Sequence, residues 1–345
     1  MKTSVIGATG YGGVELLRLL VSHPHLEISS IHSSSRMGER MSEQYPHLHT
    51  LVDHPLQEID IEKIANTSEL VFLATPPGTS KELTPELLKQ GLKVIDLSGD
   101  FRMKDPDTYE KWYKKAAAPK QELQKAVYGL TEWKRKEVEG ASLISNPGCY
   151  ATATLLVAAP LMIHRMIEES SIIIDAKSGV SGAGKSPTAM THFPEIHDNL
   201  KIYKVNEHQH IPEIEQMLLE WNEQAKPITF STHLIPITRG IMVTMYAQVK
   251  KETTIEQLRQ LYEESYMNAP FVRIRNAGAY PSPKEVSGSN YCDIGLAYDE
   301  RTGRITVVSV IDNLMKGAAG QAVQNANILL GVTETTGLAI VPLYP

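Results

Sequence analysis

The chain is short of cysteine, of long apolar runs and of excess positive charge. Two cysteines among 345 residues are too few for a disulfide framework, which favours a reducing, cytoplasmic location. No stretch reaches the ~18 uncharged apolar residues of a membrane-spanning helix, and the first apolar run is too short for a signal peptide. The formal net charge of −6 argues against non-specific binding to nucleic acid or anionic membranes. We therefore expect a cytoplasmic protein without a nucleic-acid or membrane partner.

The first part of the chain alternates short apolar runs with helical patterns. We predict strands at Thr3–Ile6, Leu26–His32, Leu70–Ala74, Lys93–Leu97 and Ser142–Ser145. Helical patterns such as Val14–Val21 and Lys81–Gln90 separate them. This βαβ rhythm predicts an α/β domain with a doubly wound, Rossmann-type parallel sheet.

The rhythm changes beyond residue 148, where strands outnumber helices. We predict strands at Ser171–Ala176, Ile228–Ile235, Gly240–Val249, Phe271–Ile274, Tyr291–Tyr298 and Arg304–Ile311, with a helix at Ile255–Asn268. The turn-rich DERTGR joins the last two strands and predicts an antiparallel hairpin. The final helix Met315–Leu330 is rich in small residues and is expected to pack back on the first domain. The sequence thus predicts one domain at 1–148 plus 315–345, and a second, α+β domain with a mixed or antiparallel sheet at 149–314.

A glycine-rich stretch, VIGATGYGGVELLRLL, joins the first strand to the first helix. Its glycine spacing suits a tight turn that a pyrophosphate approaches closely. The phosphates would bind at the helix N-terminus, where N–H groups and the helix dipole attract anions. A glycine-rich turn without a ligand is the alternative, but strand, spacing and helix agree on nucleotide binding. The predicted cofactor contacts are Gly7, Thr9, Gly10, Tyr11, Gly12 and Gly13.

The end of the second predicted strand indicates which nucleotide binds. NAD-binding proteins usually carry Asp or Glu there, on the ribose 2′-hydroxyl. This chain offers IHSSSRMG, with Ser33, Ser34, Ser35 and Arg36. Hydroxyls and a guanidinium suit a 2′-phosphate, which a carboxylate would repel. The alternative is a polar surface loop. We predict NADP as the cofactor, with Ser34, Ser35 and Arg36 among its contacts.

The motif SNPGCYATA marks a loop that turns into the predicted helix Cys149–Met166. The first turn of a helix favours the thiolate and lowers the thiol pKa from ~8.5. The thiolate is the nucleophilic form, so we predict that Cys149 is a catalytic nucleophile. A small buried cysteine at the start of a core helix is the alternative. Cys292, in NYCDIGLAYD, lies beside apolar residues and is interpreted as structural.

Two histidines in VNEHQHIPEIEQML precede an amphipathic helix. A metal pair is one interpretation, but no nearby cysteine or carboxylate set completes tetrahedral spacing, so we predict no metal. We predict His208 as the general acid/base, because histidine titrates near neutral pH. His210 remains its competitor, since sequence does not tell which ring faces the thiol.

The stretch GVSGAGKS, Gly179 to Ser186, matches the P-loop pattern of ATPases and kinases. A P-loop needs a helix directly after Lys-Ser, and Pro187 and Pro194 leave little room for one. We interpret the stretch as a flexible glycine loop at the substrate or nicotinamide site. Ser178 and Gly179 are accordingly predicted to contact the cofactor, and Gly182 the substrate.

Taken together, these motifs resemble those of the N-acetyl-γ-glutamyl-phosphate reductase family of arginine biosynthesis, within the wider semialdehyde dehydrogenases. The resemblance covers essentially the whole chain and rests on GATGYGGVELLRLL, SNPGCYATA, SGVSGAGK, EHQHIPEI and DNLMKGAAGQAVQNAN. It implies NADPH-dependent reduction of an acyl phosphate through a thioacyl intermediate on Cys149, with His208 handling the proton. It also implies a homo-oligomer, a dimer or tetramer, and a last helix near the nicotinamide, with Asn313 as a cofactor contact.

The substrate that the resemblance implies carries a carboxylate and a phosphate, which arginines bind well. Surface ion pairing is the alternative role of those arginines. The predicted substrate contacts are Arg102, Asn146, Gly182, His210 and Arg239. Aspartate-semialdehyde dehydrogenase, with the same chemistry on a shorter acyl phosphate, is the alternative enzyme. A redox-sensing NADP-binding regulator and a thiol hydrolase are alternatives of other classes, and the hydrolase leaves the glycine turn unexplained.

Overall fold

The structure is a computed structural model that describes residues 1–250 and 253–344. The chain forms two compact units. The first unit contains Met1–Gly148 and Ala318–Ala339, and the second contains Cys149–Gly317 and the C-terminal residues from Ile340 onward. The sequence predicts a return to the first domain near residue 315, and in the structure the returning segment runs from Ala318 to Ala339.

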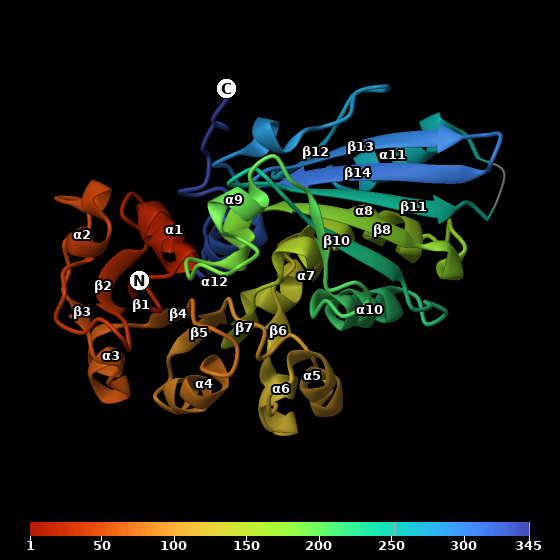
Figure 1. Ribbon diagram of the computed structural model, residues 1–345. Coiled ribbons are helices and arrows are strands. Elements are labelled where there is room, and N and C mark those ends of the chain that lie inside the picture. Colours follow the sequence, from red (N-terminus) through yellow and green to blue (C-terminus); the bar gives the residue numbers. More distant parts are fainter. Residues whose placement is uncertain (251–252, 345) are drawn as a thin grey trace. The chain divides into compact units, whose positions relative to one another are not determined.

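The first unit is built on a parallel sheet (Figure 1). Its strand order is β3-β2-β1-β4-β5-β7-β6, and each pairing is parallel. The bounds are β1 Lys2–Ile6, β2 Glu27–His32, β3 Leu56–Gln57, β4 Leu70–Leu73, β5 Lys93–Asp96, β6 Val127–Tyr128 and β7 Leu143–Ser145. The order reverses between β1 and β4, the type of point at which such sheets bind nucleotides. The predicted Rossmann-type sheet is confirmed.

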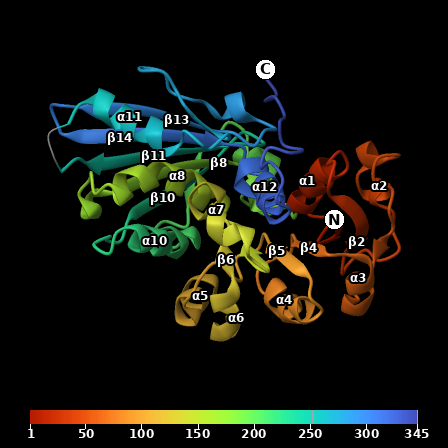
Figure 2. The same ribbon diagram turned by 180° about the vertical axis from the view of Figure 1, so that it is seen from behind.

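Helices connect these strands, and several of them pack against the sheet. They are α1 Tyr11–Leu20, α2 Met41–Gln44, α3 Ile61–Thr67, α4 Ser80–Lys89, α5 Pro106–Tyr113, α6 Lys120–Lys125 and α7 Thr131–Glu139. The returning helix α12, Gly320–Leu329, lies beside α1 and α7 (Figure 2). Its Asn325 side chain donates to the carbonyl oxygen of Gly129, 2.9 Å away. A Cβ atom on Gly129 would lie 2.5 Å from the Asn325 amide nitrogen, so this close packing requires glycine.

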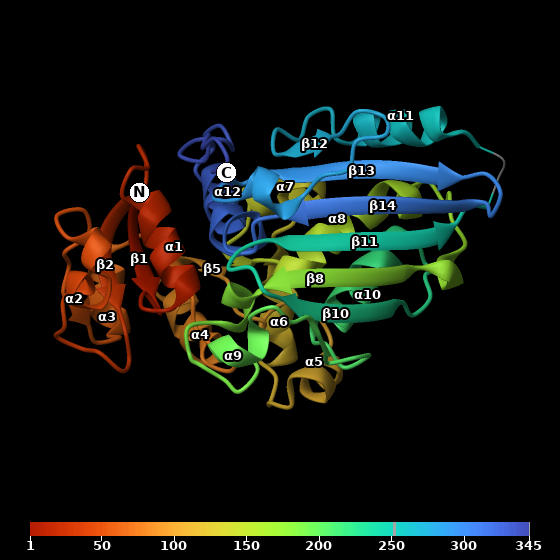
Figure 3. The same ribbon diagram turned by 45° about the horizontal axis from the view of Figure 1, so that its top comes forward.

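The second unit contains a mixed sheet with the order β12-β13-β14-β11-β8-β10-β9 (Figure 3). Its strands are β8 Ile173–Gly179, β9 Lys201–Tyr203, β10 Thr229–Ile235, β11 Ile241–Gln248, β12 Val272–Ile274, β13 Cys292–Asp299 and β14 Arg304–Ile311. Its helices are α8 Cys149–Ile163, α9 Phe193–Ile196, α10 His210–Trp221 and α11 Ile255–Ser265. Strands β13 and β14 form the predicted antiparallel hairpin. The predicted mixed-sheet α+β domain is therefore confirmed.

Some element bounds differ from those predicted. Strand β8 continues to Gly179 instead of ending at Ala176, because Lys177 and Ser178 pair with β10 on one side and β11 on the other. Helix α8 ends at Ile163 instead of Met166, because Arg165 adopts a left-handed φ of 53°. Within the described residues, no helix is both long and apolar enough to cross a bilayer.

Candidate functional site

The glycine turn after β1 is shaped by close backbone contacts. Gly7 has a φ of 85°, and a Cβ atom there would lie 2.4 Å from the carbonyl oxygen of Ala74. A Cβ atom on Gly13 would lie 2.4 Å from the carbonyl oxygen of Gly7. Both contacts are too short for any side chain, so these two glycines set the approach of α1 to β1 and β4.

Gly10 and Gly12 have a different role in the same turn. Gly10 is the N-cap of α1 and provides no side chain to its first N–H groups. A Cβ atom on Gly12 would have no heavy atom within 4 Å. The absence of a Cβ atom there leaves room beside the start of the helix, as the approach of a pyrophosphate requires. The turn therefore leaves the space that a dinucleotide needs, and Thr9 and Tyr11 stand on either side of Gly10 in the sequence.

The segment after β2 keeps its polar groups at the surface. Ser34, Ser35 and Arg36 are exposed, whereas Ser33 is buried. One guanidinium nitrogen of Arg36 lies 3.2 Å from a carboxylate oxygen of Glu39, and both side chains are well exposed. Exposed ion pairs of this kind are weak, so Arg36 can exchange Glu39 for an anionic ligand at little cost.

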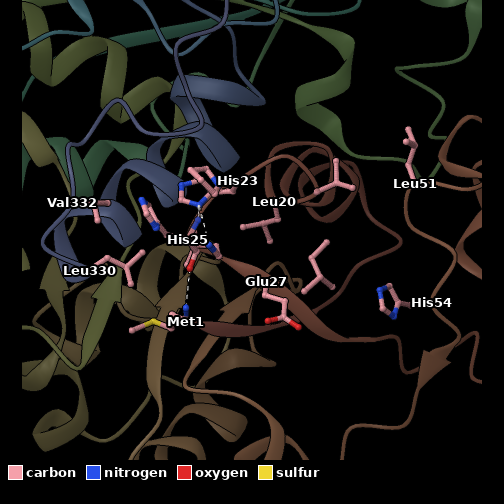
Figure 4. A pocket seen from close by; sticks show the side chains of 13 residues that line it. Met1, Leu20, His23, His25, Glu27, Leu51, His54, Leu330 and Val332 are labelled. Carbon is pink, nitrogen blue, oxygen red and sulfur yellow. Dashed lines mark hydrogen bonds between the residues drawn. The ribbon is translucent and has the colours of Figure 1, made fainter.

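A cavity of about 700 Å³ lies at the other end of the same sheet (Figure 4). The side chains that line it include those of Met1, His23, His25, Glu27 and Leu330. Its residues lie at the amino ends of β1 and β2, whereas the glycine turn follows the carboxyl end of β1. The His23 ring is bound to the side-chain oxygen of Asn327 at 2.9 Å, which gives this histidine a structural role. Nothing links the cavity to nucleotide binding.

In the second unit, Cys149 is the first residue of α8 and is partly exposed. The rest of the helix is buried as far as Met162. A Cβ atom on Gly317 would lie 2.8 Å from the Cβ atom of Cys149, so a glycine is required where this segment passes the thiol. A thiol at a helix N-terminus is stabilised as the thiolate. The structure thus places Cys149 at a helix N-terminus, and its role as the nucleophile stays a prediction.

A cluster of rings lies beside Cys149. The Tyr150 ring centre lies 5.3 Å from that of His208 and 6.1 Å from that of His210. The Tyr203 ring centre lies 5.9 Å from that of His208. The structure therefore brings both predicted histidines to the residue that follows Cys149.

The two histidines differ in their hydrogen bonds. The backbone N–H of His210, at the start of α10, donates to Nδ1 of His208 at 3.1 Å. A ring nitrogen that accepts a hydrogen bond carries no hydrogen, so the hydrogen of His208 lies on Nε2. Burial, with smaller contributions from the positive charges of His210 and Lys204, lowers the pKa of His208 from 6.5 to about 2. His208 is therefore a neutral ring with a single N–H donor.

The glycine loop after β8 is held close to Asn313. Ser178 is buried, and a Cβ atom on Gly182 would lie 3.0 Å from its hydroxyl and 3.8 Å from the side-chain nitrogen of Asn313. Asn313 donates to the Ser181 hydroxyl at 2.9 Å and accepts from the backbone N–H of Gly240 at 2.7 Å. Its side chain therefore fixes this loop.

The P-loop interpretation of the same stretch is excluded. The chain forms a short 3-10 turn at Val180–Ala183, and the next helix, α9, begins only at Phe193. No helix begins directly after Lys185 and Ser186, where a P-loop would bind phosphates.

The two predicted substrate arginines are bound within the protein, in different units. In the second unit, Arg239 makes two hydrogen bonds with the Asp312 carboxylate, at 2.9 and 3.0 Å. In the first unit, Arg102 donates to the carbonyl oxygens of Asn146 and Leu97, at 2.9 and 3.0 Å. Both arginines thus brace loops, and their binding to substrate remains a prediction.

Asn146 is also bound within the first unit. Its side-chain nitrogen donates to the carbonyl oxygen of Ala318 at 3.0 Å, and its side-chain oxygen accepts from Asn325 at 3.1 Å. Asn146 is 1% exposed, so it supports the loop before Cys149 from inside the unit. Its contact with substrate likewise remains a prediction.

Sequence reasoning missed Tyr150 and Tyr203 as site residues. Tyr150 directly follows Cys149, and Tyr203 lies five positions before His208 in KIYKVNEHQH. The available signal was their closeness in sequence to the two predicted catalytic residues.

Family models match both units. The semialdehyde dehydrogenase NAD binding domain matches residues 2–141, and the semialdehyde dehydrogenase dimerisation domain matches residues 149–313. Solved structures of aspartate semialdehyde dehydrogenases share the fold at low identity. The enzyme II from Vibrio cholerae has a TM-score of 0.72 and 17% identity, covering 96% of this chain and 98% of that one. The Candida albicans enzyme with NADP has a TM-score of 0.70 and 18% identity, covering 95% and 98%.

Much closer relatives are known by sequence. Proteins from Bacillus cereus (strain AH187) and Bacillus anthracis, both named N-acetyl-gamma-glutamyl-phosphate reductase, are 69% identical over 344 residues, covering 100% of each chain. The protein of that name from Bacillus mycoides (strain KBAB4) is 68% identical over 345 residues, again covering 100% of each chain. The chain therefore belongs to the semialdehyde dehydrogenase family and, within it, to the N-acetyl-γ-glutamyl-phosphate reductases.

Proposed function

We propose that the chain reduces N-acetyl-γ-glutamyl 5-phosphate to N-acetylglutamate 5-semialdehyde and phosphate, with NADPH as the reductant, in arginine biosynthesis. The observation that carries this proposal is the full-length identity of 69% to proteins named for that reaction. It is supported by a thiol at the first residue of α8 and a neutral histidine N–H donor in the same unit.

In the first step, Cys149 acts as the nucleophile. Its thiolate forms a bond to the acyl carbon, the bond from that carbon to the phosphate oxygen breaks, and phosphate leaves with the electron pair. The product is a thioester on Cys149. The position at the start of α8 supports this role, because the helix dipole favours the thiolate at neutral pH.

His208 stabilises the oxygen that becomes negative in each half of the reaction. Its Nε2–H is a fixed donor, since Nδ1 is occupied by the backbone N–H of His210. Bound NADPH supplies the hydride that reduces the thioester. Hydride addition leaves the thiohemiacetal as an alkoxide, and when this anion collapses to the aldehyde its carbon–sulfur bond breaks and the thiolate of Cys149 is restored, so the cycle returns the nucleophile in its reactive form. This step needs a hydrogen-bond donor more than a titrating base.

Residues of both units are proposed to bind the cofactor. The glycine turn from Gly7 to Gly13 would hold the pyrophosphate. Ser34, Ser35 and Arg36 would hold the 2′-phosphate, which is why we propose NADP rather than NAD. In the second unit, Ser178 and Gly179 at the end of β8, and Asn313, which binds the loop that follows, are proposed to contact the nicotinamide end.

The remaining assignments concern the substrate and the assembly. Arg239 is the stronger candidate for a substrate anion, because its side chain is 26% exposed while that of Arg102 is largely buried. Asn146, Gly182 and His210 complete the proposed substrate contacts.

The match to a dimerisation domain supports a homo-oligomer, a dimer or tetramer. We also propose a cytoplasmic location, as expected of a biosynthetic enzyme with two cysteines and no disulfide between them.

The reverse reaction tests the proposal. We expect the purified protein to reduce NADP⁺ with N-acetylglutamate semialdehyde only when phosphate is present. Cys149→Ser should abolish nearly all turnover and keep NADPH binding, whereas Cys292→Ser, the control, should be nearly silent. Faster turnover of aspartate semialdehyde would identify the alternative enzyme. Nucleotide binding without turnover of either aldehyde would indicate a regulator.

A further inference from the structure

A fully buried carboxylate, that of Asp312, directly follows strand β14 in the second unit. It accepts hydrogen bonds of 2.9 and 3.0 Å from Nε and Nη2 of Arg239. It also accepts from three backbone N–H groups, those of Gly288 at 2.7 Å, Leu314 at 2.9 Å and Met315 at 3.1 Å. The backbone donors fix the plane of the carboxylate, and the two-nitrogen pair fixes the plane of the guanidinium on it.

The backbone that carries Arg239 runs along the glycine loop after β8. Carbonyl oxygens of the segment 237–240 accept hydrogen bonds of 2.9 to 3.0 Å from the N–H groups of Gly179, Val180 and Ser181. On the far side of Arg239, the N–H of Gly240 donates to the side chain of Asn313 at 2.7 Å. Asp312 and its neighbour Asn313 therefore hold the side chain and the backbone of one segment, which lies beside the loop proposed to contact substrate and cofactor.

The backbone of Asp312 is connected to the proposed nucleophile. Its carbonyl oxygen accepts a hydrogen bond of 3.0 Å from the N–H of Gly317. A Cβ atom on Gly317 would lie 2.8 Å from the Cβ atom and 3.3 Å from the Cα atom of Cys149. Asp312 thus holds Arg239 with its side chain and, with its carbonyl oxygen, the segment that passes Cys149.

The two members of the ion pair differ in exposure. The Arg239 side chain is 26% exposed, whereas that of Asp312 is 0% exposed. A ligand that approaches this pair therefore meets the guanidinium, and the carboxylate holds the guanidinium from behind. A long side chain loses conformational entropy when it binds an anion, and this loss is smaller where a carboxylate has already oriented the side chain.

We propose that Asp312 is a positioning residue that orients Arg239 for one anionic group of the acyl-phosphate substrate. The inference rests on the proposed function, in which Arg239 binds that substrate. Asp312 is buried and acts through Arg239, and its carbonyl oxygen keeps the anion site in register with the segment beside Cys149. If the pair only braced the loops, its loss would lower stability without changing substrate binding.

The test is a double-mutant cycle in the phosphate-dependent reverse reaction, with separate KM values for phosphate and for the semialdehyde. Arg239→Ala should raise one of the two KM values by about 10–100-fold, as expected for the loss of a charge-assisted contact. Asp312→Asn should raise the same KM by about 3–10-fold with a smaller change in kcat, because the arginine is no longer oriented before binding. The double variant should match Arg239→Ala within about twofold, since Asp312 acts only through Arg239.

Asp293→Asn is the matched control in the same unit. Asp293 is also fully buried and binds Arg273 through the same two guanidinium nitrogens, but this arginine lies over the ring of Tyr291, 4.1 Å from its centre. Asp293→Asn and Asp312→Asn should both lower Tm, because each removes the partner of a buried ion pair. Only Asp312→Asn should change a substrate KM, which separates positioning from stability.

Chemical rescue of Arg239→Ala provides a measurement that leaves Asp312 in place. Added guanidinium should bind the Asp312 carboxylate and lower the raised KM, whereas methylammonium, which cannot form a two-nitrogen pair, should not.

The inference would be overturned by unchanged KM values in Arg239→Ala, by equal rescue with both cations, or by a rise in different KM values for the two single variants. A double variant that shows the product of the two single effects would also overturn it. In each of these cases phosphate-dependent turnover by the wild type would leave the proposed function standing. The absence of that turnover would refute the proposed function instead.

Discussion

A histidine as buried as His208 is a different chemical group from a histidine in water. With Nδ1 occupied by the His210 N–H and the ring held neutral, it has one N–H hydrogen to donate, and its ring lone pair is already engaged. The proposed reaction returns the thiolate at the end of each cycle, so a fixed donor is sufficient. This revises the sequence-based expectation of a general acid/base at this position into a proposal of a neutral donor.

Two replacements of His208 distinguish a donor from an acid/base. Gln carries an N–H near the position of Nε2, whereas the Asn amide lies near Nδ1. We expect His208→Asn to lower kcat by about 10²–10⁴-fold and His208→Gln to retain clearly more activity, with the NADPH Kd unchanged in both. Equal losses in the two variants would support proton transfer by the ring.

His210 is the comparison residue for this measurement. His210→Asn should cost less than His208→Asn, because the contact of His210 with His208 uses its backbone N–H, which the replacement keeps. A larger loss from His210→Asn would exchange the two roles.

A single replacement tests the proposed choice of NADP over NAD. Arg36→Ala should weaken NADPH binding by about 10–100-fold, the value of a hydrogen-bonded charge contact, and leave NADH binding nearly unchanged. Arg40→Ala is the matched control, since its guanidinium is already bound to Asp53 at 2.6 Å. Titration of NADPH and NADH by fluorescence gives both dissociation constants for the wild type and for each of the two variants. Equal losses for NADPH and NADH in Arg36→Ala would assign Arg36 a structural role.

At the scale of elements, the glycine turn contains two adjacent glycines with opposite requirements. A Cβ atom fits at Gly12 but collides with the carbonyl oxygen of Gly7 when placed at Gly13. Gly12→Ala should keep or slightly raise Tm, because alanine favours the helix, and should lower NADPH affinity by filling the space beside the helix N-terminus. Gly13→Ala should lower both Tm and affinity. If Gly12→Ala bound NADPH normally, the pyrophosphate would not approach this position.

Elements with strong local signals were predictable from the sequence. The glycine turn, the strand-rich second unit and the helix that begins at Cys149 follow from spacing and turn residues within a few positions. The edge strand β9 was missed, because three residues carry no readable period, and Tyr203 was missed with it. The contacts of Arg102 with Asn146, and of Arg239 with Asp312, span 44 and 73 positions, so no local pattern reveals that these arginines brace loops.

At the scale of the whole molecule, buried titratable groups in the two units respond to pH in opposite directions. In the first unit, burial, with the nearby charge of Asp100, raises the pKa of Asp96 from 3.8 to about 6. Between these values the folded chain binds more protons than the unfolded chain, so the contribution of Asp96 to stability falls as pH rises. In the second unit, the lowered pKa of His208 means that the unfolded chain binds more protons below pH 6.5, so its contribution falls as pH falls.

Urea unfolding of variants at pH 4 to 7 separates these two contributions. Relative to the wild type, Asp96→Asn should gain stability steadily as pH rises from 4 to 6, by about 1–3 kcal/mol in all. The backbone N–H and the hydroxyl of Ser98 both donate to the Asp96 carboxylate at 2.9 Å, and changes in these bonds in the variant add only an offset that does not vary with pH. His208→Gln should show the opposite trend and gain relative to the wild type as pH falls from 6.5, because the glutamine does not titrate. A flat difference between wild type and variant across this range would mean that the replaced group has the same pKa in the folded and unfolded chains. If the His208→Gln variant gave this flat difference, the neutral state of His208, on which its role as a fixed donor depends, would have to be abandoned.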